Sequence, residues 1–222
     1  MRPRKMPVVY SSILLLAVWP CRAENIDPYN DGSQYGYGEN VGWVNFEPSV
    51  PGAGAHVTSE KLTGFIWAEN IGWIKLDPTY GGVVNDGTGR LSGYAWGENV
   101  GWINFNPIVP GAPLSYGVTI NQEGRFSGWA YGENIGWINF NPEQLYGYGV
   151  RACVVDFHDL AAFADLWLAG DIPAGGPAPP GIGGVDFGDY AAFAQYWREF
   201  CPDGWQWKPA APPPGICALQ TP

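Results

Sequence analysis

Four copies of one aromatic phrase constrain the fold of this chain more than any other feature of its sequence. The copies are YGYGENVGWVNFEP from residue 35, GFIWAENIGWIKLDP from 64, GYAWGENVGWINFNP from 93 and GWAYGENIGWINFNP from 128. Their equivalent tryptophans, at positions 43, 73, 102 and 137, lie 30, 29 and 35 residues apart. Repetition with a period of this length is typical of architectures in which each unit buries apolar surface against its neighbours.

Each unit has the pattern of three short strands. In the fourth unit these are GVTIN (117–121), RFSGWAY (125–131) and IGWINF (135–140), separated by turn sequences. Both faces of such strands carry apolar side chains, so one unit is unstable alone and must pack on the others. The sequence therefore predicts a mainly β domain of four stacked three-stranded repeats, arranged as a small propeller or as an open array resembling a β-solenoid.

The ends of the repeat array leave two arrangements open. The first copy has little room for an opening strand, whereas YGYGV at 146–150 resembles the start of a further unit. A C-terminal strand that completed the N-terminal unit would close the array, and an open curved stack is the alternative.

The repeated aromatic residues are the candidate binding platform. We expect Trp73, Trp102 and Trp137 to lie in the core. Aromatic side chains that remain exposed can stack on sugar rings. The expected platform comprises Trp67, Trp96, Trp129 and Tyr131.

A Glu-Asn pair also recurs in every copy. The candidate polar ligands of a sugar or cation beside the platform are Glu98, Asn99, Glu133 and Asn134. The alternative, which four near-identical copies favour, is that the pairs only build hairpin turns. There Asn tolerates left-handed backbone angles and its side chain bonds the local backbone.

The first 23 residues have the features of a cleaved secretory signal. A basic start precedes an apolar stretch from Val8 to Trp19 that is too short to span a bilayer. Seven basic and 21 acidic residues follow this segment, which gives a formal charge of −14. Such a charge argues against nucleic acid or a membrane surface as a partner. We expect a secreted or cell-surface protein.

Beyond residue 150, two related segments predict a pair of amphipathic helices. VDFHDLAAFADLW (155–167) and VDFGDYAAFAQYW (185–197) agree at nine of 13 positions. Each begins with an Asp suited to an N-cap and has a second Asp three residues later, as in a capping box. The expected domains are thus a signal peptide at 1–23, a β-repeat domain at 24–150, a helical pair at 151–203 and a Pro-rich tail at 204–222.

These two segments resemble the duplicated halves of type I dockerin domains. In that family, D-x-N-x-D-G-x-V-D-x-x-D-L precedes each apolar helix and forms an EF-hand-like calcium loop. The resemblance implies calcium ligands at loop positions 9 and 12, which are Asp156 and Asp159 in one half and Asp186 and Asp189 in the other. It also implies a cohesin-like protein partner.

The early loop positions depart from the dockerin pattern. Positions 1, 3 and 5 are Tyr148, Val150 and Ala152 in the first half, and Ala178, Pro180 and Ile182 in the second. None of these supplies a side-chain oxygen comparable to a carboxylate, so we expect no cofactor and little or no calcium binding.

A disulfide is expected to replace calcium in holding the helices. Cys153 precedes the first helix and Cys201 follows the second, in a compartment where disulfides persist. A bond between them would close a long loop and stabilise the pair. The competing pairing joins Cys201 to Cys217 in the tail.

The remaining motifs argue against catalysis. The sequence has no nucleophile elbow, no HExxH and no CxxC. The aromatic copies also resemble a GENIGWINF-type repeat of exported bacterial proteins, which implies an architecture but no chemistry. The sequence therefore predicts a secreted, non-catalytic modular protein with a structural or carbohydrate-adhesive β surface and a dockerin-like docking or anchoring module.

The expected partner is a polysaccharide, or a cohesin-like or cell-surface protein. The alternative is a subunit of an extracellular polysaccharide-degrading assembly, which would bind cohesin or act as a weak glycoside hydrolase.

Overall fold

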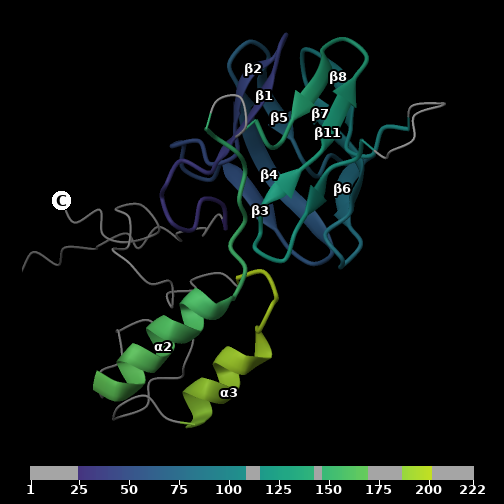
Figure 1. The fold of residues 1–222 in the computed structure, drawn as a ribbon. Coiled ribbons are helices and arrows are strands. Elements are labelled where there is room, and N and C mark those ends of the chain that lie inside the picture. Colours follow the sequence, from purple (N-terminus) through teal and green to yellow (C-terminus); the bar gives the residue numbers. More distant parts are fainter. Residues whose placement is uncertain (1–24, 109–115, 143–146, 170–186, 202–222) are drawn as a thin grey trace, which may run out of the picture.

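The structure is a computed structural model that describes residues 25–108, 116–142, 147–169 and 187–201 of the chain. These residues form a β-barrel with two helices beyond one end of it (Figure 1). The expected signal peptide and the whole of the expected tail, Cys217 included, lie outside the described residues.

Four antiparallel β-hairpins, one from each aromatic copy, build the barrel. In the order of the chain the hairpin strands are β1 (Tyr35–Gly38) and β2 (Gly42–Asn45), β4 (Lys61–Ala68) and β5 (Gly72–Lys75), β7 (Leu91–Gly97) and β8 (Gly101–Asn104), and β11 (Trp129–Gly132) and β12 (Gly136–Asn139). The predicted strand pairs around each GEN or AEN turn are therefore confirmed.

The hairpins join edge to edge into one closed ring of eight strands. The order is β2-β1-β12-β11-β8-β7-β5-β4, and the pairing of β2 with β4, through Val44 and Ala68, closes it. Closure leaves no unpaired edge in this ring, which explains why two-stranded units are stable here. The closed alternative is thus correct. The open array and the propeller of separate blades are both wrong, because the units share one sheet.

The opening strands of the repeats form a second tier at the end of the barrel nearer the helices. They are β3 (Gly54–Val57), β6 (Gly82–Asn85) and β9 (Thr119–Ile120), and β9 pairs with β10 (Phe126–Ser127). The first copy obtains its opening strand from the C-terminal side, since Ala152 bridges to Ile26 and Val150 to Gln34. A C-terminal segment therefore does complete the N-terminal unit.

Each hairpin turn has three residues followed by a glycine in the left-handed region. In the third copy Gly97 pairs with Gly101, Val100 N–H donates to Gly97 O at 3.1 Å, and Gly101 has φ of +82°. A three-residue hairpin loop that ends in a left-handed residue is a common type, and it favours glycine at that position. The asparagine of the Glu-Asn pair does not take the left-handed angle that we expected of it.

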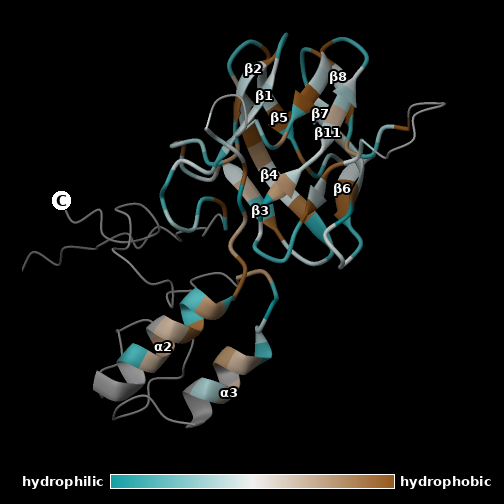
Figure 2. Cartoon of the chain, in the orientation of Figure 1, coloured by the Kyte–Doolittle hydropathy of each residue, from teal (hydrophilic) through white to brown (hydrophobic). Residues whose placement is uncertain are grey.

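The barrel interior is filled by the side chains that alternate with the tryptophans. Along the barrel strands, strongly hydrophobic residues alternate with residues of intermediate hydropathy (Figure 2). Phe46, Phe105, Phe126 and Phe140 are each no more than 1% exposed, and their ring centroids form a connected cluster with separations of 5.3 to 6.1 Å. Valine, isoleucine and alanine side chains fill the rest, as suits an eight-stranded barrel whose interior is just wide enough for side chains.

The two predicted helices are α2 (Phe157–Ala169) and α3 (Phe187–Gln195). Phe163 of α2 and Phe193 of α3 are buried, with ring centroids 5.3 Å apart. Cys153 and Cys201 form a disulfide with a Cα–Cα distance of 5.3 Å. The favoured pairing is therefore confirmed, and the competing Cys201–Cys217 bond is wrong.

Candidate functional site

An aromatic girdle surrounds the barrel near the hairpin turns. It has one outward-pointing aromatic residue on each of the eight barrel strands, because side chains alternate between the two faces of a strand. The girdle residues are Tyr37, Trp43, Trp67, Trp73, Trp96, Trp102, Tyr131 and Trp137. Within each hairpin, two of them are cross-strand partners. Their ring centroids lie 4.8 to 5.1 Å apart, at interplanar angles of 57° to 73°.

The predicted platform residues all lie on this outer surface. Trp67 is 39% exposed, and Trp96, Trp129 and Tyr131 are each 36% exposed. They do not form one flat surface, because β4, β7 and β11 are separated around the ring. The platform is therefore distributed around the barrel.

The predicted core tryptophans also lie outside, so that expectation is wrong. Trp102 is 42% exposed, while Trp73 and Trp137 are half-buried. Phenylalanine and isoleucine occupy the interior instead, and each of these tryptophans packs edge-on against its partner across the hairpin. Such aromatic pairs contribute about 0.5–1.5 kcal/mol beyond the area they bury.

The asparagines of the Glu-Asn pairs connect neighbouring hairpins. Asn134 Nδ2 donates to Val100 O at 3.0 Å, and Asn99 Nδ2 donates to Ile71 O at 3.1 Å. Asn70 Nδ2 donates to Asn40 O at 3.3 Å, and Asn40 Nδ2 to Ile135 O at 3.2 Å. The four bonds form a ring around the end of the barrel. They give Asn99 and Asn134 a structural role between repeats, whereas the structural alternative to a ligand site predicted a bond to the local backbone.

The glutamates of the same pairs are exposed and differ among the copies. Glu69 Oε2 accepts a hydrogen bond from Trp43 N–H at 3.0 Å, which fixes it against the preceding hairpin. Glu39, Glu98 and Glu133 have no hydrogen bond or ion pair with any described residue. These three carboxylates therefore remain available to a ligand.

A pocket of about 420 Å³ opens where the first and fourth hairpins meet, between β1 and β12. Four rings line it, those of Tyr37, Tyr116, Trp129 and Trp137. The ring centroid of Trp137 is 5.4 Å from that of Tyr116 and 6.5 Å from that of Trp129, which stands nearly perpendicular to it at 88°. Polar groups come from Glu39, Asn40 and Asn139. We call this the β1–β12 pocket.

Only one residue of the β1–β12 pocket, Trp129, was among the predicted site residues. Glu98 and Asn99 lie in the turn of the third hairpin, and Glu133 and Asn134 in that of the fourth. Tyr37 and Trp137 are 100 positions apart in the sequence, and ring closure brings their strands together. The repeat could have indicated the position of this pocket. If the four copies form a closed ring, the last copy must lie beside the first.

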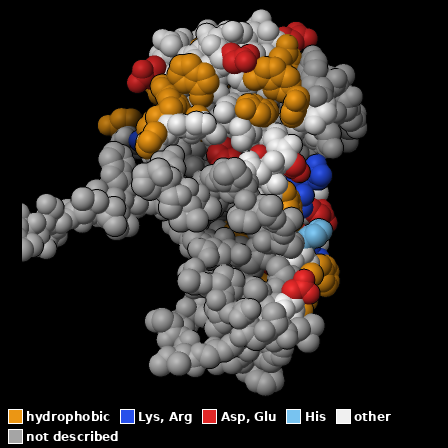
Figure 3. Space-filling view, turned by 90° about the vertical axis from the view of Figure 1, so that its left-hand side faces the viewer, with side chains coloured by type: hydrophobic (Ala, Val, Ile, Leu, Met, Phe, Trp, Pro, Cys, Tyr) orange, Lys and Arg blue, Asp and Glu red, His pale blue; other side chains and the backbone are white. Residues whose placement is uncertain are grey.

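The surface around the girdle is apolar and acidic. Figure 3 shows hydrophobic side chains gathered on the barrel part of one face, with acidic side chains among them. Among the residues that the structure describes, no Lys, Arg or His lines the β1–β12 pocket. Such a surface suits a ligand with apolar faces and hydroxyl or cationic groups better than an anion.

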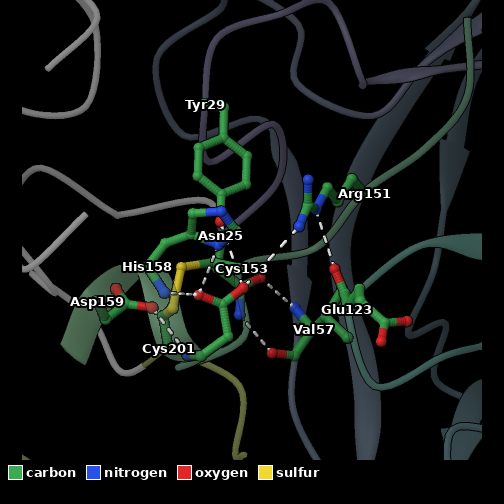
Figure 4. Close-up of a disulfide and its surroundings, with 10 residues drawn as sticks. Asn25, Tyr29, Val57, Glu123, Arg151, Cys153, His158, Asp159 and Cys201 are labelled. Atoms are coloured by element: carbon green, nitrogen blue, oxygen red, sulfur yellow. Dashed lines mark hydrogen bonds and ion pairs between the residues drawn. A yellow bond between two sulfur atoms is a disulfide. The ribbon is translucent and has the colours of Figure 1, made fainter. Parts of the chain in front are cut away.

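Two of the candidate calcium ligands, Asp156 and Asp159, serve the fold at the start of α2, where Figure 4 shows Asp159 near the disulfide. Asp156 N–H donates to Asp159 Oδ2 at 2.8 Å, and His158 N–H donates to Asp156 Oδ1 at 2.8 Å. These bonds form the predicted cap of α2. Arg151 lies 3.9 Å from Asp156 Oδ2 and stacks on the ring of Tyr29. Burial and the nearby Asp156 raise the pKa of Tyr29 to about 12.

This arrangement does not fit an EF-hand-like calcium site. Calcium takes six to eight oxygen ligands. Among the described residues, no group of three or more His, Cys, Asp or Glu side chains is placed to hold a metal. Asp186 and the side chain of Asp189 lie outside what is described.

Comparison with known proteins finds no protein family, no curated protein and no solved structure that matches the chain. Within the described part of the chain, no helix has the length and apolar character required to cross a membrane.

Proposed function

We propose that the barrel is a non-catalytic carbohydrate-binding module of a secreted or cell-surface protein. The observation that carries this proposal is the β1–β12 pocket, where three aromatic rings from two hairpins and that of Tyr116, which precedes β9, surround an opening of sugar size. Aromatic rings can stack on the apolar faces of sugars, while the amide and carboxylate groups of the same pocket can bond hydroxyls.

The girdle extends this surface beyond one pocket. Outward-facing aromatic pairs recur on all four hairpins, so a polysaccharide that reaches several of them would gain affinity from multiple weak contacts. This favours a polymeric ligand over a small metabolite.

The proposal is tested by measuring binding of the full chain to neutral oligosaccharides through tryptophan fluorescence. Trp137→Ala should weaken binding by at least about tenfold, because an aromatic anchor in a pocket typically contributes 1–2 kcal/mol or more. Tyr80→Ala is the matched control, since this ring is 92% exposed and lies outside the pocket. If no oligosaccharide binds, or if both variants bind like the parent, the proposal is wrong. Release of shorter sugars from a bound oligosaccharide would instead support the weak glycoside hydrolase.

We also propose that the helical pair is a docking or anchoring module. Phe157 is 64% exposed, its ring centroid lies 5.0 Å from that of Trp197, and the guanidinium of Arg198 lies over both rings. An exposed aromatic and arginine surface is typical of the centre of a protein interface. Binding of the full chain to a panel of cohesin domains, with Phe157→Ala as the test variant, distinguishes docking from a purely structural role. Failure of every cohesin to bind would exclude the dockerin-like partner.

A further inference from the structure

The four contacts between neighbouring hairpins are equivalent in topology but not in content. Between the first and second hairpins, Glu69 Oε2 accepts the Trp43 N–H, and Asn70 Nδ2 donates to Asn40 O. Between the second and third, Asn99 Nδ2 donates to Ile71 O. Other rings of the outer face are covered locally: Tyr148 packs on Trp43 with centroids 5.6 Å apart, and Lys75 Nζ lies 5.5 Å from the ring centroid of Phe65 in the same hairpin.

Within the third repeat, Trp102 lies over Gly81, where an added Cβ would come within 2.7 Å of the indole ring, and beside Tyr94 of the same hairpin at 6.2 Å between centroids. The contact between the fourth and first hairpins holds the β1–β12 pocket. In the fourth repeat, Tyr116 takes the position that Gly81 has in the third, so the indole of Trp137 has an aromatic neighbour there instead of a glycine.

The charge of the β1–β12 pocket has one sign only. Glu39 is exposed at its rim and, among the described residues, has no hydrogen-bond or ion-pair partner. The equivalent Glu69 is held by the Trp43 N–H. In the described part of the chain no side chain that could carry positive charge lines the pocket, and the chain beyond residue 23 has 21 acidic and seven basic residues.

Aromatic faces combined with an unpaired carboxylate favour an organic cation. The negative face of each ring attracts an ammonium group, and Glu39 adds a direct charge interaction. A neutral sugar would use the rings but not the charge, and a uronic acid or sulfated sugar would be repelled. We infer that the β1–β12 pocket selects glycans that carry a protonated amine, as glucosamine units do. This inference rests on the proposed carbohydrate-binding function and names the class of sugar.

The test compares short oligosaccharides of glucosamine with N-acetylglucosamine and glucose oligosaccharides of the same length. Binding to the full chain is measured by calorimetry at low salt, at a pH where the amine is protonated. We expect the glucosamine form to bind roughly tenfold more tightly than the acetylated form, which corresponds to about 1.4 kcal/mol. Glu39→Gln should remove this preference, so that the glucosamine and acetylated forms bind the variant with similar affinity.

Glu98→Gln is the matched control. Glu98 occupies the same turn position in the third hairpin and is equally exposed, and it lies outside the pocket. Both variants lower the net negative charge by one, so a general attraction of cations to an acidic protein would be reduced equally in the two.

The outcomes separate this inference from the proposal on which it rests. Equal affinity for the glucosamine and acetylated forms, or equal effects of Glu39→Gln and Glu98→Gln, would overturn the selection of amino sugars while leaving carbohydrate binding in place. Absence of binding in every arm would overturn both.

Discussion

The barrel and the helical pair are stabilised by different means. In the described residues the barrel buries a connected core of 25 apolar side chains, and both of its tiers are closed by hydrogen bonds. A side chain closes the second tier. The amide of Asn25 donates to the carbonyl oxygen of Val57 and accepts its N–H, as the backbone of a paired strand would. The helical pair has five buried core residues, and two of them are the cysteines of its disulfide.

This difference shows two ways to stabilise a small module. The barrel gains stability from repetition, since each added hairpin pairs the open edges of its neighbours. The helices bury too little apolar surface to be comfortably stable alone, so a covalent bond restricts their unfolded state. The two modules should therefore respond differently to the same kind of perturbation.

The largest effect is expected from Phe140→Ala, at the centre of the phenylalanine cluster. This ring is 1% exposed and contacts three other buried rings, so its loss leaves a cavity. We expect the free energy of unfolding of the barrel to fall by about 3–5 kcal/mol. Denaturant unfolding monitored by fluorescence measures it. Phe163→Ala, between the helices, should leave the barrel transition in place, and a common loss in both would contradict the division into two modules.

The second effect concerns the disulfide. Cys153→Ser removes a bond that spans a sequence separation of 48 and should destabilise the helical pair by about 2–4 kcal/mol. Hydrogen exchange of the full chain is the measurement. Protection should be lost in α2 and α3 and retained in the barrel strands. Unchanged protection of the helices would mean that their aromatic contacts suffice.

A smaller effect is expected on the outer surface of the barrel. Trp102→Ala removes a 42% exposed ring that packs against Trp96 and over Gly81. The expected loss is about 1–2 kcal/mol, because the ring contributes packing but leaves no internal cavity. Thermal unfolding compares it with Tyr80→Ala, which should have almost no effect. A loss of stability equal to that of Phe140→Ala would contradict this prediction, because it would mean that Trp102 contributes as much as a core side chain.

The alternation of side chains could be predicted from the sequence, but the face that points inward could not. Trp137 is flanked by Gly136 and Ile138, and both faces of its strand are apolar. The small residues indicate which face of each strand points inward. Ala130 and Ala95 point inward opposite isoleucines, which leaves room for the phenylalanines in a barrel too narrow for the eight rings of the girdle.

The position of the site depended on closure, which local sequence does not encode. Pairing of β1 with β12 brings Tyr37 beside Asn139 and creates the β1–β12 pocket. The capping acids Asp156 and Asp159, by contrast, were predictable because a cap involves residues only a few positions apart. Short-range features were therefore predicted better than the arrangement of the repeats.

The ring of asparagine bonds at the end of the barrel should contribute modestly. Asn134→Ala breaks one bond, to Val100 O, at an exposed position and should cost about 0.5–1.5 kcal/mol. Gln122→Ala is the control, because this exposed amide has no hydrogen bond to any described residue. If the two variants unfold at the same temperature, the bond from Asn134 to the neighbouring hairpin does not stabilise the barrel. Ligand binding would then be the better explanation for an asparagine at this position in every copy.

The smallest effect is expected from calcium, which in dockerins would stabilise the region that the disulfide holds here. Asp159 Oδ2 already accepts the Asp156 N–H, and Asp156 faces Tyr29 at 3.3 Å and Arg151 at 3.9 Å. Calcium would have to displace these contacts and would gain too few oxygen ligands in return. We therefore expect the melting temperature of the full chain to shift by less than about 1 °C up to millimolar calcium.

A chelator serves as the reference in this titration. The melting temperature of Cys153→Ser should also be insensitive to calcium, because loss of the disulfide leaves the number of carboxylate ligands near Asp159 unchanged. A rise of several degrees that Asp159→Asn abolishes would contradict this prediction, since it would mean that α2 releases its cap to bind the ion. The helical pair would then be stabilised by both the disulfide and a bound calcium ion. The barrel, by contrast, is stabilised by its buried core and the closure of its sheet.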